Sequence, residues 1–243
     1  MTQTSAALQT AAEVAVLLPG TGSDEVFVRS AFEVPLAAAG IRALTPRPRP
    51  GPGIGEAFLD ALDEAATNGP VLAGGVSFGA HLAVEWALRN PDRCAGLLLA
   101  LPAWSGPPES SPAAVAARLG ADAVRAGGVE AALQTVKASV DPWLAEELGR
   151  AWRRYGDGLA DSLRVAADRP APTLADLAAI GAPAGVAGCP DDQVHPLEVA
   201  KSWAAALPNA ALATTRLDII GADPEALGRA TVLAWLRAGG TPA

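Results

Sequence analysis

Cysteine and large aromatic side chains are both scarce in this sequence. Only two of the 243 residues are cysteines, Cys94 and Cys189, and they lie far apart in apolar surroundings. A disulfide framework is therefore not expected, and the favoured interpretation is two free, buried thiols with no metal site. Aromatic residues make up 5% of a chain that is half hydrophobic, so alanine supplies most of the apolar excess. That composition suits closely packed helices.

Long apolar runs and a leader-like start are also missing. No apolar run approaches the ~20 residues that a transmembrane helix needs. Residues 1–10 are polar and uncharged, and they lack the basic start and apolar segment of a secretory signal. We therefore expect a cytoplasmic protein without a membrane partner.

Basic residues are outnumbered by acidic ones, 18 to 26, so the formal net charge is -8. Duplex binding draws on clustered Lys and Arg, so nucleic acid is not an expected partner. The one basic cluster, Arg47 and Arg49, is interleaved with prolines and is typical of an exposed loop. Gly20-Thr21-Gly22 and Gly51-Pro52-Gly53 lack the rest of a phosphate-binding fingerprint, so no nucleotide, flavin or other cofactor is expected. The expected partner is a small-molecule substrate; the oligomeric state leaves no signal in the sequence.

Strand-like apolar runs alternate with helical patterns along the chain. This alternation predicts an α/β fold in which a mostly parallel sheet is covered by helices on both faces. The length suits one domain with an insertion. The expected strands are 13–19, 41–45, 71–76, 94–101, 182–187 and 210–214, and the expected helices include 56–66, 80–89, 198–206 and 224–237.

The segment 102–181 has no strand pattern and is interpreted as a helical lid inserted into a core formed by 1–101 and 182–243. It holds four large rings, Trp104, Trp143, Trp152 and Tyr155. Large rings carry much of any packing interface, so they can attach the lid to the core. Alternatively some of them line an apolar substrate pocket, for which Trp104 and Trp143 are the candidates.

A G-x-S-x-G motif, Gly75-Val76-Ser77-Phe78-Gly79, joins the third expected strand to the helix after it. A serine at such a tight turn is forced into a strained backbone conformation, and glycines are needed where chains approach closely. The turn presents the hydroxyl at the N-terminus of a helix, where unpaired amides favour negative charge. Ser77 is therefore the candidate nucleophile.

With this motif in its strand-to-helix context, the chain resembles the α/β-hydrolase superfamily over essentially its whole length. The resemblance implies an oxyanion loop after the first strand, which here is Leu17–Ser23. The backbone amides of Thr21 and Phe78 would form the oxyanion hole. Pro19 stands where the family commonly has histidine, which is tolerable because the donor is main chain. A glycine-rich turn without a ligand is the alternative.

The resemblance also implies a catalytic acid after the fifth expected strand. Counting three residues from Gly188, or three back from Val194, gives Asp191. Spacing to Pro196 favours Asp192 instead, and Asp191 is preferred of the two. Alternatively both aspartates cap the next helix or satisfy loop amides.

The family's catalytic histidine is apparently missing. It belongs on the loop after the last strand, where this chain has Leu217 or Asp218, and the only histidines are His81 and His195. His81 is expected to be a buried core residue. His195 is expected to serve its own loop, although its closeness to the acid makes it a candidate displaced base. Asp218 could be a weaker base if burial raised its pKa.

These features predict an enzyme that acts on a small acyl compound, an ester, thioester or lactone, through Ser77 and an oxyanion hole. Removing one triad member usually leaves only ~10³ to 10⁴-fold catalysis over water. A non-hydrolytic enzyme of the cyclase or lyase type, or a ligand-binding pseudo-hydrolase with an incomplete triad, are therefore the alternatives.

Overall fold

A six-stranded parallel sheet forms the centre of the molecule. The computed structural model describes residues 12–243, so the polar stretch 1–10 lies outside the described residues. The strand order is β2-β1-β3-β4-β5-β6, and every neighbouring pair is parallel. The strands are β1 (Val14–Leu18), β2 (Arg42–Leu44), β3 (Val71–Val76), β4 (Cys94–Ala100), β5 (Ala184–Gly188) and β6 (Ala210–Thr214). The predicted α/β class with a mostly parallel sheet is confirmed.

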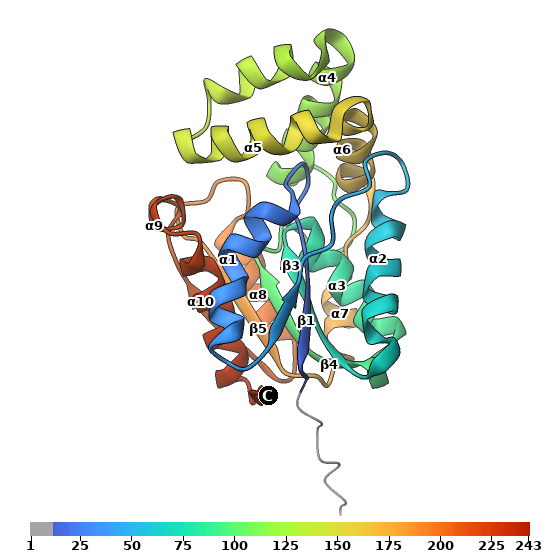
Figure 1. Cartoon of the computed structure of the whole chain (residues 1–243), viewed down its shortest axis with the longest axis vertical. Coiled ribbons are helices and arrows are strands. Elements are labelled where there is room, and N and C mark those ends of the chain that lie inside the picture. Colours follow the sequence, from blue (N-terminus) through green and yellow to red (C-terminus); the bar gives the residue numbers. More distant parts are fainter. Residues whose placement is uncertain (1–11) are drawn as a thin grey trace, which may run out of the picture.

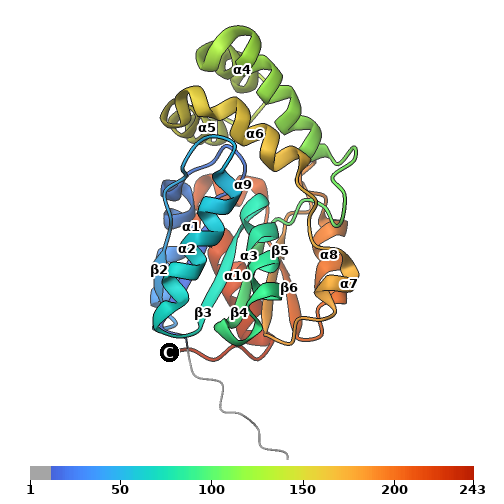
Figure 2. The same cartoon turned by 90° about the vertical axis from the view of Figure 1, so that its right-hand side faces the viewer.

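Helices cover both faces of this sheet (Figures 1 and 2). Successive side chains of a strand point to opposite faces, so Leu17 joins the core cluster beside α1 and α10. Val16 and Leu18 join the other cluster, with α2, α3 and α8. The helices of the core are α1 (Glu25–Ala37), α2 (Ile54–Ala65), α3 (Phe78–Arg89), α8 (Leu197–Ala206), α9 (Leu217–Ala222) and α10 (Glu225–Arg237). In the described part of the chain, no helix combines the length and apolarity that crossing a membrane requires.

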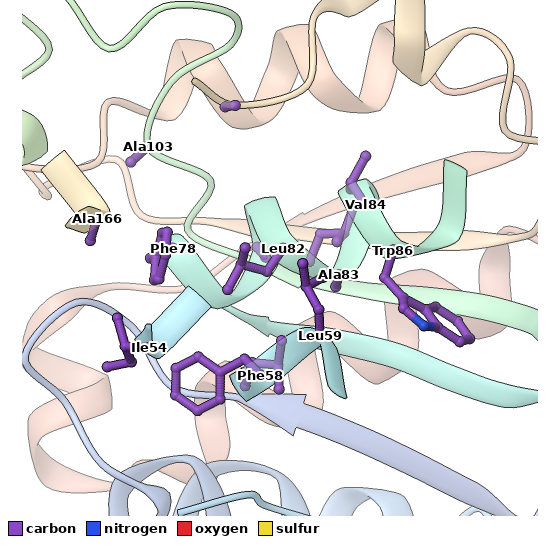
Figure 3. Packing of buried hydrophobic residues seen from close by; sticks show 14 of the residues in the cluster. Ile54, Phe58, Leu59, Phe78, Leu82, Ala83, Val84, Trp86, Ala103 and Ala166 are labelled. Atoms are coloured by element: carbon purple, nitrogen blue, oxygen red, sulfur yellow. The ribbon is translucent and has the colours of Figure 1, made fainter. Parts of the chain in front are cut away.

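The helix that follows Ser77 is buried on nearly all sides. Figure 3 shows Phe78 and Leu82 of α3 beside Ile54 and Phe58 of α2, all of them fully or almost fully buried. Burying a large apolar side chain contributes roughly 1.5–3 kcal/mol. The packing therefore holds the N-terminus of α3, and with it the turn at Ser77, in one position.

The insertion between β4 and β5 is helical, and no strand occurs in its described residues. Its helices are α4 (Pro112–Lys137), α5 (Pro142–Tyr155), α6 (Leu159–Asp168) and α7 (Leu174–Leu177). The first three lie together above the carboxyl ends of the strands, whereas α7 packs against α8 at the side of the sheet (Figures 1 and 2). Helix α4 is kinked at Gly128, whose φ of 78° is not helical.

Two of the large rings of α5 attach it to the core. Trp143 stacks on Phe27 of α1, with ring centroids 6.3 Å apart, and lies against Gly221 of α9. Trp152 is buried between Gly120 of α4 and the loop after β1. These contacts agree with the interpretation that the rings join the helical segment to the sheet.

Helices α1 and α10 approach each other closely at Gly228. A Cβ added to this glycine would overlap the carbonyl oxygen of Ala31, so no side chain fits there. We expect Gly228→Ala to lower the free energy of unfolding by about 1–3 kcal/mol, as overpacking does. Gly181→Ala is the control, because a Cβ there meets nothing within 4 Å. Urea unfolding of both variants checks this, and equal stabilities would contradict it.

Candidate active site

Ser77 sits at a strained turn between β3 and α3. Its φ of 54° and ψ of -112° lie outside the regions that residues with a Cβ usually adopt. The turn is held by the Ser77 amide, which donates to the carbonyl of Ala100 at 2.9 Å. A Cβ on either Gly75 or Gly79 would overlap the carbonyl oxygen of Leu18. The sequence argument for glycine at both positions therefore has its physical cause in the end of β1.

A histidine reaches Ser77 from the loop between β5 and α8. The Nε2 atom of His195 lies 3.0 Å from Ser77 Oγ, and its Nδ1 atom lies 2.8 Å from Asp192 Oδ2. The carboxylate accepts from Nδ1–H, which leaves Nε2 as the acceptor for the serine hydroxyl. The serine hydroxyl, the imidazole and the carboxylate thus form one continuous chain of hydrogen bonds.

The carboxylate that binds His195 belongs to Asp192, which also binds backbone amides of its own loop. Its Oδ1 atom accepts from the amides of Val194 at 2.8 Å and His195 at 3.0 Å. Burial disfavours its charge, but the hydrogen bonds and charge of His195 and the two amides outweigh burial, so its pKa lies below the usual value. Asp192 is therefore ionised at neutral pH and able to orient the imidazole.

Asp191, the residue preferred from spacing, points elsewhere. Its carboxylate accepts from the amide of Leu217 at 3.2 Å and lies 3.5 Å from Arg216. It thus satisfies the first amide of α9, and not an amide of the helix near Leu197 that the pair was weighed to cap. Neighbouring side chains on a loop point in different directions, so counting along the sequence could not choose between them. The structure brings Asp192, and not Asp191, to His195.

The loop after β6, where a histidine was expected, contains the short helix α9. Asp218 lies on this helix, with its side chain 63% exposed and bonded to Arg216 at 3.0 Å. Burial was the condition for Asp218 to replace the base, and the side chain is not buried. The imidazole beside Ser77 comes from the β5–α8 loop instead.

His81 is buried, as expected, next to this site. Its Nε2 atom accepts from the amide of Ala103 at 3.1 Å, and its ring packs edge-on against Trp104 with centroids 4.6 Å apart. Burial, with a smaller effect from the charge of His195, lowers the pKa of His81 to about 3. The side chain is therefore a neutral acceptor that holds Ala103 and packs against Trp104.

Of the two residues expected to form the oxyanion hole, Phe78 directly follows Ser77 and Thr21 lies on the loop after β1. Phe78 is the first residue of α3, where amides lack an acceptor within the helix. Thr21 is half-buried in the loop after β1. Its neighbour Gly20 touches the turn: a Cβ there would lie 3.5 Å from Ser77 Cβ and 3.3 Å from the carbonyl oxygen of Val76. Both segments therefore meet at Ser77.

The two candidate pocket rings lie apart. Trp104 is buried against His81, next to the site. Trp143 lies between α1 and α9, on Phe27 and Gly221.

Both cysteines are free and buried, and burial raises the pKa of each thiol to about 12. Within residues 12–243, no three His, Cys, Asp or Glu side chains gather as a metal site would require.

The fold and this geometry define an α/β-hydrolase fold with its serine at the strand-to-helix turn. Among solved structures, the chain is similar to an esterase from Thermogutta terrifontis, with 22% identity over 95% of this chain and 92% of that one and a TM-score of 0.72. MenH from S. aureus has 16% identity, covers 94% of each chain and has a TM-score of 0.72. The enol-lactonase from Burkholderia xenovorans LB400 has 20% identity over 94% and 93%, with a TM-score of 0.69. The sequence matches no protein-family model and no curated protein.

The buried, neutral His81 makes stability depend on pH. The unfolded chain binds a proton at His81 below about pH 6.5, whereas the folded chain does not until about pH 3. Stability is therefore lost as pH falls through this window, with a slope of about 1.4 kcal/mol per pH unit from this group. We expect His81→Gln, which keeps an acceptor for the amide of Ala103, to reduce this slope by about 1.4 kcal/mol per pH unit, the contribution of one bound proton. Urea unfolding between pH 4 and 7 measures both slopes, and identical slopes would rule out this role.

Proposed function

We propose that the protein is a serine hydrolase of small acyl compounds, with Ser77 as nucleophile, His195 as general base and acid, and Asp192 as the orienting carboxylate. The proposal is carried by the single chain of hydrogen bonds from Ser77 Oγ through His195 to Asp192, at 3.0 Å and 2.8 Å. Esters, thioesters and lactones are the substrate classes that such a constellation cleaves. The neighbouring structures described as an esterase and an enol-lactonase are consistent with this class.

The reaction follows from the positions of these groups. His195 Nε2 takes the proton from Ser77 Oγ as the oxygen attacks the carbonyl carbon, and the amides of Thr21 and Phe78 receive the developing oxyanion. His195 then gives the proton to the leaving oxygen or sulfur, which leaves an acyl-serine. Water attacks the acyl group with His195 again as the base, and Ser77 is restored. Asp192 keeps Nδ1 protonated and stabilises the imidazolium.

In this proposal the base comes from an unusual position, three residues after the acid on the same loop. Catalysis depends on where the nitrogen lies and which atom it faces, and it does not depend on which loop delivers it. Asp192 binds both the ring and the backbone amide of His195, so the two residues are held as one compact unit. The loop after β6 is then free to form α9.

The alternatives of a pseudo-hydrolase or a non-hydrolytic enzyme rested on the lack of a base for Ser77. An imidazole nitrogen 3.0 Å from the hydroxyl removes that reason. The side chain of His195 is 18% exposed, so solvent reaches the imidazole. Hydrolysis is therefore the function that this geometry supports best.

Labelling with a fluorophosphonate tests the nucleophile. We expect the wild-type protein to be labelled at Ser77, because the imidazole at 3.0 Å activates the hydroxyl. Ser77→Ala should abolish labelling, and His195→Gln should slow it by about 10²-fold or more, because the base is lost. Peptide mass spectrometry locates the adduct, and melting temperatures show that the variants are folded. A folded wild-type protein that stays unlabelled would refute the proposal.

The adjacent aspartates provide a matched pair. We expect Asp192→Asn to lower kcat/KM for an activated ester by about 10² to 10⁴-fold, because an amide cannot hold the imidazole in the required tautomer. The asparagine oxygen can still accept from the loop amides, so the fold should be preserved. Asp191→Asn should stay within about threefold of wild type. Equal losses in the two variants would contradict the assignment of Asp192.

A further inference from the structure

The lid helix α5 binds the residue that ends the loop after β1. Tyr155 donates from its hydroxyl to the carbonyl of Ser23 at 2.8 Å. The hydroxyl of Ser23 in turn donates to Glu147 Oε1 at 2.6 Å. The amide of Ser23 donates to Gly20 at 3.1 Å, which closes the turn that contains Thr21. Three hydrogen bonds therefore fix Ser23, and two of them come from side chains more than 120 residues away.

Both lid side chains are buried where they meet this loop. Glu147 is 6% exposed and Tyr155 is 5% exposed. Burial raises the pKa of Glu147 to about 7, against the opposing effects of the Ser23 hydroxyl and Arg150. Burial also raises the pKa of Tyr155, so its hydroxyl remains a donor. Burying a carboxyl group costs stability unless its partners compensate, and packing alone would be better served by an apolar residue.

The next residue, Asp24, ties the same helix to the start of α1. Asp24 is the N-cap of α1 and accepts from the amides of Val26 and Phe27. Its carboxylate, 2% exposed, pairs with Arg150 and Arg154 of α5, each at 2.9 Å. Such paired and desolvated charges hold a fixed geometry better than exposed pairs do. The position of α5 and the end of the loop are thereby coupled.

Trp152 completes the contact on the active-site side. A Cβ on Gly22 would lie 2.7 Å from its indole nitrogen, and φ at Gly22 is +69°. The loop from Gly20 to Ser23 thus lies between the turn at Ser77 and helix α5. Thr21, the expected oxyanion donor, is in the middle of this loop.

We infer that Glu147 and Tyr155 are positioning residues, which set the amide of Thr21 by holding Ser23. The inference rests on the proposed function, in which that amide receives the oxyanion. Oxyanion donors act only when they lie about 2.7–3.1 Å from the charged oxygen, and a displacement of about 1 Å can cost about 10²-fold in rate. The lid helix must therefore be docked on the core for the oxyanion hole to be formed.

The test removes each hydrogen bond with a substitution of similar size, Tyr155→Phe and Glu147→Met, because a methionine side chain has no oxygen to accept from the Ser23 hydroxyl. We expect each to lower kcat for an activated ester by about tenfold while KM changes less than about twofold, because ground-state binding does not use the oxyanion hole. Affinity for a trifluoromethyl ketone, whose adduct carries an oxyanion, should weaken by the same factor as kcat/KM. Thr231→Val is the matched control, because it removes a buried hydroxyl that donates to the carbonyl of Leu227 on α10 at 2.7 Å.

The outcomes separate this inference from the proposed function. If the wild-type protein neither turns over esters nor is labelled at Ser77, the proposed function and this inference both fall. If wild type is active and folded Tyr155→Phe and Glu147→Met keep its kcat and ketone affinity, only the positioning role is overturned. A loss of activity that follows the fraction of unfolded protein, with Thr231→Val affected equally, also overturns it. Melting curves at the assay temperature measure that fraction.

Discussion

The contact between the end of β1 and the turn at Ser77 constrains the rest of the site. The carbonyl of Leu18 lies so close to Gly75 and Gly79 that neither can carry a side chain. This approach holds Ser77 at a φ of 54° and places Gly20 of the loop after β1 against the turn. The packing of α3 against α2 on one face of the sheet supplies the stability that the strained residue costs. The turn at Ser77 and the loop after β1 are therefore two parts of one rigid junction.

The loop between β5 and α8 completes this junction with two side chains. Asp192 is buried and bonded by amides of its own loop, so its direction is fixed before it meets the imidazole. His195 then spans the distance to Ser77 without help from another loop. Because His195 and Asp192 lie on one short loop, fewer independent segments have to be positioned around Ser77. It also leaves Asp191 and the segment after β6 for a structural role in α9.

The helical segment above the strands is connected to this junction by polar contacts as well as by packed rings. Glu147 and Tyr155 bind Ser23, and the arginines of α5 pair with Asp24. Buried charge pairs and hydrogen bonds are more directional than apolar contacts, so they fix α5 in one register on the core. The chemistry proposed for Ser77 is thereby linked to the docking of a segment that lies far from it in sequence.

The local sequence determined that the sheet is parallel, where strands and helices alternate along the chain, and where the tight turn at Ser77 falls. These features depend on periodicity and on glycine at positions of close approach. The sequence also indicated that His81 is buried. Only the tertiary structure decided that His195 meets Ser77, 118 residues away, and that Asp192 rather than Asp191 holds it. Side-chain direction on a loop, and distance between segments remote in sequence, follow from packing of the whole chain, which no local pattern contains. For the same reason the contacts of Trp143 and Glu147 could not be read from their neighbours along the chain.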